Sequence, residues 1–71
     1  GIFNISFLSE DIDNFEITIV DAFGKVVSNE DKQDFIGEYT KIVDLSSYPR
    51  GIYIVQIKTK DSFVSKRIVL Q

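Results

Sequence analysis

The feature that most constrains this chain is an alternation of apolar and polar side chains that recurs along most of its length. Phe3, Ile5 and Phe7 alternate with polar residues, and residues 15–19 and 53–58 repeat the pattern with little interruption. Because successive side chains of a strand point to opposite faces, this period of two predicts half-buried β-strands. No segment shows the period of a helix, so we predict an all-β domain.

The composition agrees with this prediction. The 71 residues include 11 Ile, 7 Val and 9 aromatic residues, but only 1 Ala and 3 Leu. β-Branched and aromatic side chains suit a pleated, half-buried surface, whereas Ala and Leu lose least on entering a helix. A chain of this length has room for one small core, and we treat residues 1–71 as a single domain.

Polar and turn-forming segments separate the alternating runs. Residues 9–14 and 29–34 are predicted to be polar loops, and Pro49 indicates a crossover at residues 45–51 because proline cannot donate to a strand ladder. The remaining segments are short strands at regular spacing. We predict a small antiparallel Ig-like β-sandwich of six or seven short strands, with a small barrel as the alternative.

The residue types exclude most catalytic chemistry. The sequence contains no His, Cys, Met or Trp, so it has no imidazole base, thiolate nucleophile, Cys/His zinc site or haem ligand. An enzyme built from carboxylates alone would need a facing pair, and the sequence gives no ground for one. We therefore predict that the domain is not an enzyme, with no catalytic residue and no cofactor.

One acidic segment has part of the pattern of a calcium site. Asp11 and Asp13 have the spacing of a calcium loop, but Phe15 lies where the next side-chain ligand is needed, and the usual Gly and Glu are missing. A second acidic cluster at residues 29–34 would share an ion only if both loops lay at one end of the domain. We predict solvated loops and no metal site.

Two glycine-containing motifs predict defined backbone geometry. Asp21 followed by Gly24 and Lys25 predicts a tight hairpin, in which the Asp side chain binds its own backbone and the Gly takes a positive φ. Gly51 reopens a strand and is expected to allow a close backbone approach or a positive φ. Tyr53 is expected to pack its ring in the core while its hydroxyl reaches a partner.

Charge is distributed unevenly along the chain. Residues 1–34 carry eight acids and two bases, and residues 35–71 carry three acids and six bases. The simpler interpretation is that strands from the two halves pair with complementary charges. The alternative is a cationic patch that contacts an anionic partner. Its members would be Lys58, Lys60, Lys66 and Arg67.

Four segments occur in an order that resembles a known family. They are Gly1–Ile5, Ile17–Val27 with its Asp-x-x-Gly-Lys turn, Val43–Val55 with Asp-Leu-Ser and Gly-x-Tyr, and Ser65–Gln71 with its basic-apolar tail. Together they resemble the C-terminal sorting domain, type A, of type IX secretion substrates in Bacteroidota. In this set Asp21, Gly24, Lys25, Gly51 and Tyr53 match the structural positions of the family motif.

The resemblance implies a secretion signal rather than a catalyst. It implies a domain fused covalently to a cargo protein, recognised by the type IX outer-membrane translocon, and often removed by a sortase-like peptidase. The cargo would reach the medium or the cell surface through the periplasm and the outer membrane. We expect neither a nucleic-acid partner nor direct membrane insertion. Family members usually have Pro-Asn-Pro ahead of the equivalent of Gly1, so we expect residues 1–71 to be the end of a larger secreted precursor, cut at a processing or artificial boundary.

The terminal segment is the candidate recognition site. Lys66 has the parity of an inward-facing strand residue, so we expect either a broken pleat or an ammonium group that reaches the rim of the sheet. A terminal edge strand also offers unpaired backbone groups to a receptor strand. The residues predicted to contact the translocon are Lys66, Arg67, Ile68, Val69, Leu70 and Gln71.

Two other binding functions remain open from the residues alone. A generic Ig-like or fibronectin-like adhesion or spacer module would have the same pattern of strands. A carbohydrate-binding module would need exposed Trp or a flat aromatic strip, and with no Trp in the sequence the candidates are Phe23, Tyr39, Tyr48 and Phe63.

Overall fold

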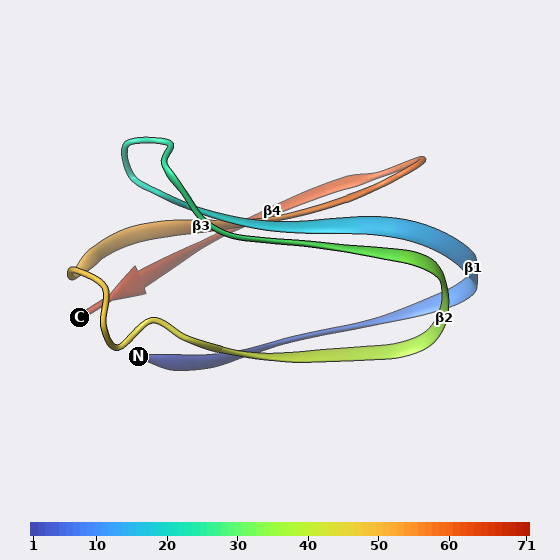
Figure 1. Ribbon diagram of the computed structural model, residues 1–71, viewed down its shortest axis with the longest axis horizontal. Helices are drawn as coiled ribbons and strands as arrows, with labels where there is room; N and C mark the ends of the chain where they lie inside the picture. The colour runs from blue at the N-terminus through green and yellow to red at the C-terminus, as the bar shows by residue number, and fades with distance from the viewer.

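The computed structural model describes residues 1–71 and confirms the prediction of an all-β chain (Figure 1). Four antiparallel strands form one sheet in the order β2-β1-β3-β4. The strands are β1 (Ile2–Asp21), β2 (Val26–Asp44), β3 (Gly51–Thr59) and β4 (Phe63–Leu70). The structure holds no helix with the length and apolarity that crossing a bilayer requires.

The prediction of six or seven strands in two sheets was wrong, because two segments predicted as loops lie inside long strands. Residues 9–14 belong to β1 and residues 29–34 belong to β2, and of these Ser9, Asp13 and residues 29–32 are paired in the β1–β2 ladder. Asn29 shows why a polar run can form a strand. It pairs with Thr18, and its side-chain amide donates to Thr18 Oγ1 at 2.9 Å and to Glu16 Oε2 at 3.1 Å. Polar side chains on an exposed face therefore satisfy one another across the strands.

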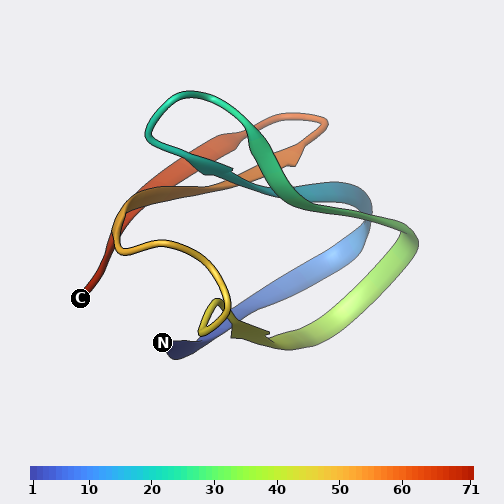
Figure 2. The ribbon, with the colours of Figure 1, turned by 60° about the vertical axis from the view of Figure 1, so that its left-hand side comes forward.

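The single sheet is folded back on itself (Figures 1 and 2). The β1–β2 register shifts between Ser9 and Asp13 and again between Asp13 and Phe15. On the partner strand, Asp34 and Gly37 have φ values of 51° and 106°. Extra residues in a ladder and left-handed backbone both bend a hairpin sharply. The bend therefore turns one end of the β1–β2 hairpin over the rest of the sheet.

The bend divides the sheet into two layers. We call residues 2–9 of β1 and 37–44 of β2 the cover hairpin. The remaining layer, the base sheet, consists of residues 15–21 and 26–32 together with β3 and β4. Leu45, just after β2, donates its backbone N–H to the carbonyl oxygen of Gly1 at 2.9 Å and so extends the cover hairpin by one bond.

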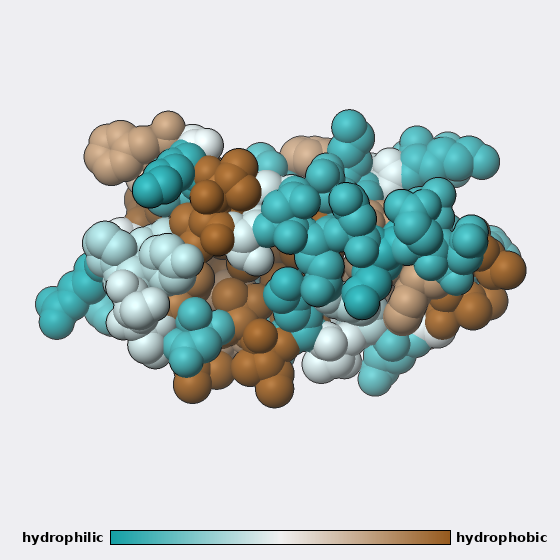
Figure 3. All heavy atoms as spheres, in the orientation of Figure 1, coloured by the Kyte–Doolittle hydropathy of each residue, from teal (hydrophilic) through white to brown (hydrophobic).

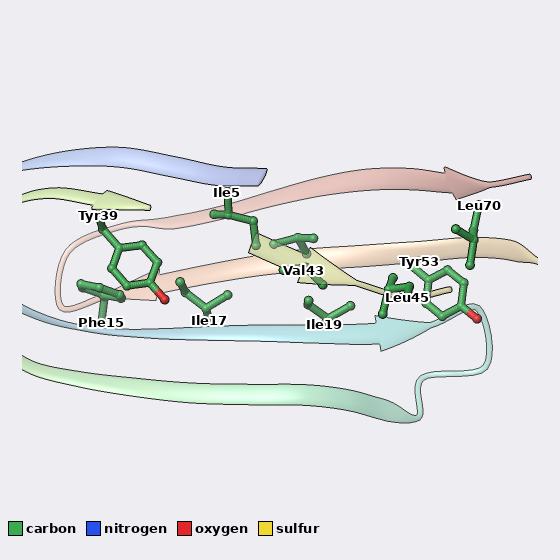
Figure 4. Close-up of a cluster of buried hydrophobic side chains, with 10 residues drawn as sticks. Ile5, Phe15, Ile17, Ile19, Tyr39, Val43, Leu45, Tyr53 and Leu70 are labelled. Atoms are coloured by element: carbon green, nitrogen blue, oxygen red, sulfur yellow. The ribbon is translucent and has the colours of Figure 1, made fainter. Parts of the chain in front are cut away.

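The core lies between these two layers (Figure 4). Ile5, Tyr39 and Val43 point inward from the cover hairpin, and Ile17 and Ile19 meet them from the base sheet. The alternation in the sequence therefore assigns the inward side chains correctly. The buried side chains are Ile5, Phe15, Ile17, Ile19, Tyr39, Val43, Leu45, Tyr53, Val55 and Leu70.

Four aromatic rings fill the core next to the bend. Phe15 contacts Phe7, Phe35 and Tyr39 with ring centroids 4.8, 5.4 and 5.1 Å apart and interplanar angles of 75° to 85°. Edge-to-face pairs of this kind add about 1 kcal/mol each beyond their buried area. The rings join residues on both sides of the bend, so they hold the cover hairpin against the base sheet.

Candidate recognition surface

The hairpin at Asp21 has the geometry that its motif predicts. One carboxylate oxygen of Asp21 accepts the backbone N–H groups of Phe23 and Lys25, each at 2.9 Å. The backbone of Asp21 also bonds to Gly24 and Lys25, and Gly24 has a φ of 87°. Because these bonds all run within the turn, the motif at this position fixes the β1–β2 connection.

Gly51 and Tyr53 begin β3 beside the crossover. Gly51 has a φ of 145°, and a Cβ placed there would meet no atom within 4 Å. Its conformation, rather than a close neighbour, therefore requires glycine. Tyr53 is buried, and its hydroxyl donates to the carbonyl oxygen of Pro49 at 2.5 Å. That bond ties the crossover to the strand that follows it, which is the kind of partner expected for this hydroxyl.

The terminal segment forms the edge strand β4. It pairs with β3 without a register shift, and its other edge pairs with no strand. Lys66 is opposite Val55, and Arg67 is opposite Ile54. The pleat is therefore unbroken, so Lys66 lies on the inner face of the base sheet while Arg67 lies on the outer face. Both side chains are exposed.

The other residues of the terminal segment follow the same alternation. Ile68 is half-buried and Leu70 is buried, on the inner face, whereas Val69 is exposed on the outer face. A Cβ added to Gly1 would lie 2.5 Å from Leu70 Cδ1, so the start of the cover hairpin rests directly on the end of β4. Gln71 follows the strand and is exposed.

The structure does not bring the predicted cationic patch together on one face. Lys58 is opposite Phe63 and Glu16 and lies on the outer face, as does Arg67, whereas Lys66 faces inward. The pairing of Lys58 with Glu16 fits the simpler interpretation, in which strands from the two halves place opposite charges side by side. The ion pair in the structure, Lys41 with Glu30, also joins the two halves.

Glu30 and Tyr39 close one side of the two layers. Glu30 is opposite Ile17 and so lies on the inner face at the β2 edge, where the Tyr39 hydroxyl donates to Glu30 Oε1. Lys41 Nζ lies 3.6 Å from Glu30 Oε2. The bond from Tyr39 and the charge of Lys41 lower the pKa of Glu30, although partial desolvation opposes them. Burial and the bond to Glu30 raise the pKa of Tyr39 to about 12.

The opposite side of the two layers is an open groove of about 860 Å³. Its wall is β1 from Phe3 to Asp11, and its floor is the inner face of β3 and β4, with Val55, Ile57 and Ile68 among the floor residues. Lys66 lies on this floor. No local pattern in the sequence predicts this groove, because the groove arises from the way the cover hairpin crosses the base sheet.

The two acidic segments lie near one another at the bend. Asp34 donates its backbone N–H to Asn14 Oδ1 at 2.8 Å, so the two acidic segments do meet at one end of the domain. No group of three or more Asp, Glu, His or Cys side chains is placed to hold an ion. Asp13 instead accepts the backbone N–H of Asn14 at 2.8 Å.

Apolar side chains are also exposed at the bend and on the cover hairpin. Figure 3 shows polar side chains over the centre of one face and apolar atoms at its lower margin and right-hand end. Ile12 and Ile36 are exposed at the bend, and Ile42 is exposed on the outward side of the cover hairpin. The exposed apolar surface is therefore spread over several places rather than gathered into an aromatic strip.

Comparison with known proteins gives one result for the whole chain. A family model described as a secretion system C-terminal sorting domain matches residues 1–71. No curated protein and no solved structure matches the chain.

Proposed function

This chain belongs to the secretion system C-terminal sorting domain family, and from that premise we propose that the type IX machinery recognises its folded sheet at the edge formed by β4. Domains of this family are sorting signals for type IX secretion. The signal directs export across the outer membrane to the medium or the cell surface. The family match favours this function over a generic adhesion or spacer module.

The free edge of β4 is the observation that supports this site. Its outer edge has no strand partner, so it offers backbone N–H and C=O groups to a receptor strand. Arg67 and Val69 are exposed on one face of that edge, and Lys66 is exposed on the other. A receptor strand added beside β4 would therefore meet cationic side chains on both faces of the sheet.

Burial separates the roles of the six residues in the terminal segment. Leu70 packs in the core and Ile68 packs against it, so their contribution to recognition is to hold the strand in place. The other four, Lys66, Arg67, Val69 and Gln71, have exposed side chains that a partner can contact. The turn at Asp21 and the strand start at Gly51 shape the domain and lie outside the proposed contact.

The remaining partners follow from the same function. We infer that residues 1–71 are the end of a larger secreted precursor, that a cargo protein is fused to them, and that a sortase-like peptidase removes the domain after export. The domain itself then acts by binding and carries out no reaction. Its lack of His and Cys is consistent with such a role.

An export assay tests the proposed contact. A fluorescent reporter carrying residues 1–71 at its end is expressed in a bacterium with an intact type IX system and in one that lacks the translocon. The reporter should leave the cell only in the first strain. Lys66→Glu and Arg67→Glu, alone and together, should reduce export several-fold, because each reverses a charge on the proposed contact strand.

A matched control separates recognition from folding. Lys58→Glu makes the same charge change at an exposed position on the neighbouring strand β3 and should leave export unchanged. Thermal melts of the isolated domain must show that all variants fold. Deleting residues 66–71 would also remove the buried Leu70, so the substitutions are the sharper test. Undiminished export of the folded double variant would rule out this contact.

A further inference from the structure

The cover hairpin has an unpaired strand edge of its own. Residues 2–9 of β1 pair with β2 on one side, whereas the pairing of β1 with β3 begins only at Phe15. Along residues 2–9 the second edge of β1 therefore has no strand partner. Unpaired backbone donors and acceptors in this arrangement can accept an added strand.

This free edge forms the wall of the groove. The groove is lined by consecutive residues of β1, from Phe3 to Asp11, but by alternate residues of β4, namely Val64, Lys66 and Ile68. Successive side chains of a strand point to opposite faces, so consecutive lining residues mean that the strand presents its edge. Alternate lining residues mean that a strand presents one face. The wall of the groove is therefore the backbone edge of β1, and its floor is the inward-facing side chains of β3 and β4.

The floor of the groove is incompletely covered. The cover hairpin contributes two strands to its layer, while the base sheet contains four. As a result Val64 is 56% exposed although it lies on the inner face, and Ile57 and Ile68 are only half-buried. One further strand beside β1, at the usual spacing of about 4.8 Å, would lie over these side chains.

Charge distinguishes the open side from the closed side. At the β2 edge, inward-facing Glu30 is bound by Tyr39 and Lys41. At the β4 edge, inward-facing Lys66 has no hydrogen-bond or ionic partner. Acidic side chains of Glu10, Asp11 and Asp13 line the same groove at the end next to the bend.

We propose that this groove binds an extended polypeptide segment that adds as a third strand to the free edge of β1. Its inward side chains would be apolar where they meet Ile68 and Val64, and a carboxylate between them would lie over Lys66. A basic side chain would follow next to Asp11. Read from the Gly1 end of the groove, the inward positions are apolar, acidic, apolar and basic.

The charges favour such a segment over a second copy of this chain. If two copies joined through the free edges of β1, the inward side chains brought to the groove would be Phe3, Ile5 and Phe7. None of these carries a carboxylate, so Lys66 would stay without a counter-charge. A segment with an acidic residue opposite Lys66 would supply the missing counter-charge.

Synthetic peptides test the proposal directly. The probe has Val, Glu, Ile and Lys at alternate positions with Thr between them. A second peptide carries the same residues in reverse order, so that both directions of the added strand are tested. One of the two should bind saturably to the folded domain and slow amide exchange at β1 residues 3–9. A scrambled peptide of the same composition should do neither.

Two matched changes show whether binding is strand addition at this groove. Methylating the peptide nitrogens along one edge should abolish binding, whereas methylating the other edge should preserve it. Lys66→Glu should weaken binding about 5-fold, the size of one exposed ion pair, and exchanging the peptide Glu for Lys should restore it. The Lys58→Glu variant, altered on the outer face, should bind like the parent.

The outcomes of these binding experiments test the groove proposal independently of the proposed export function. Absence of saturable binding for both peptides, protection confined to β4, or equal effects of methylating either edge would each overturn it. Dimerisation of the free domain with protection of β1 would also overturn it, because the occupant would then be a second copy. None of these measurements involves the secretion machinery, so the export assay cannot decide them.

Discussion

Replacing Tyr39 by Phe should loosen the cover hairpin without altering the shape of the core. The Tyr39 ring is buried among Phe7, Phe15 and Phe35, and Phe would keep those ring contacts. The substitution removes the Tyr39 hydroxyl, which links the cover hairpin to the base sheet by donating a hydrogen bond to Glu30. Its effect therefore measures the contribution of this one bond between the two layers.

The expected loss is about 1 to 2 kcal/mol in the free energy of unfolding. Hydrogen bonds to a charged group contribute about 1.5–3 kcal/mol. The Glu30 side chain is 34% exposed, so water can replace the lost donor and the lower end of that range applies. For a domain of 71 residues, such a loss lowers the melting temperature by about 7 to 13 °C.

The pH dependence gives a second and more specific signal. The pKa of Tyr39 is raised from 10.0 to about 12, so between these values the unfolded chain has lost a proton that the folded chain keeps. Stability from this group is complete below pH 10 and declines as the pH rises toward 12. From about pH 9 to about pH 11 the contribution of Tyr39 to the free energy of unfolding falls by at most about 1.3 kcal/mol, and this fall should be absent in the Phe variant.

Glu30 gives the opposite pH dependence at the acid end. Its pKa is lowered from 4.5, first by the Tyr39 hydroxyl, so the stability it contributes is present at neutral pH and is lost as the pH falls through the lowered pKa. In the Phe variant this acid loss should shrink, because the largest cause of the lowered pKa has been removed.

Urea denaturation followed by circular dichroism measures all of these differences. The control is Tyr48→Phe, since the Tyr48 side chain is exposed and its hydroxyl makes no hydrogen bond. That variant should match the parent at every pH. If Tyr39→Phe were as stable as the parent at neutral pH and lost stability equally between about pH 9 and about pH 11, the bond would contribute nothing and the reasoning would be refuted.

Three further changes test the turn, the strand start and the core by the same denaturation assay. Asp21→Ala removes the acceptor for two backbone N–H groups and should cost about 1 to 2 kcal/mol, whereas Asp21→Asn keeps an acceptor and should recover most of it. Gly51→Ala should cost about 1 to 3 kcal/mol because of the φ of 145°, and an effect near zero would mean that the backbone there relaxes freely. Leu45→Ala, at a side chain only 2% exposed, should cost about 2 to 5 kcal/mol, and a smaller loss would show that the cover hairpin closes over the cavity.

Only part of the recognition surface could be predicted from the sequence. The edge position of the last strand followed from its place in the chain, and the inward parity of Lys66 followed from its spacing to Val64 and Ile68. The closed side of the two layers was missed, because the contact between Glu30 and Tyr39 depends on where the hairpin bends. Gly37, an isolated glycine inside an alternating run, is the signal that could have located that bend.

Local chemistry decided which side chains point inward and how the β1–β2 turn closes. Alternation depends only on the pleat of a strand, and the turn at Asp21 depends on bonds within five residues, so both can be read from the sequence. Whether residues 9–14 and 29–34 were loops or strands depended on pairing between distant segments. Only the tertiary structure placed the cover hairpin over part of the base sheet, and that placement left a strand edge and Lys66 open on the same groove.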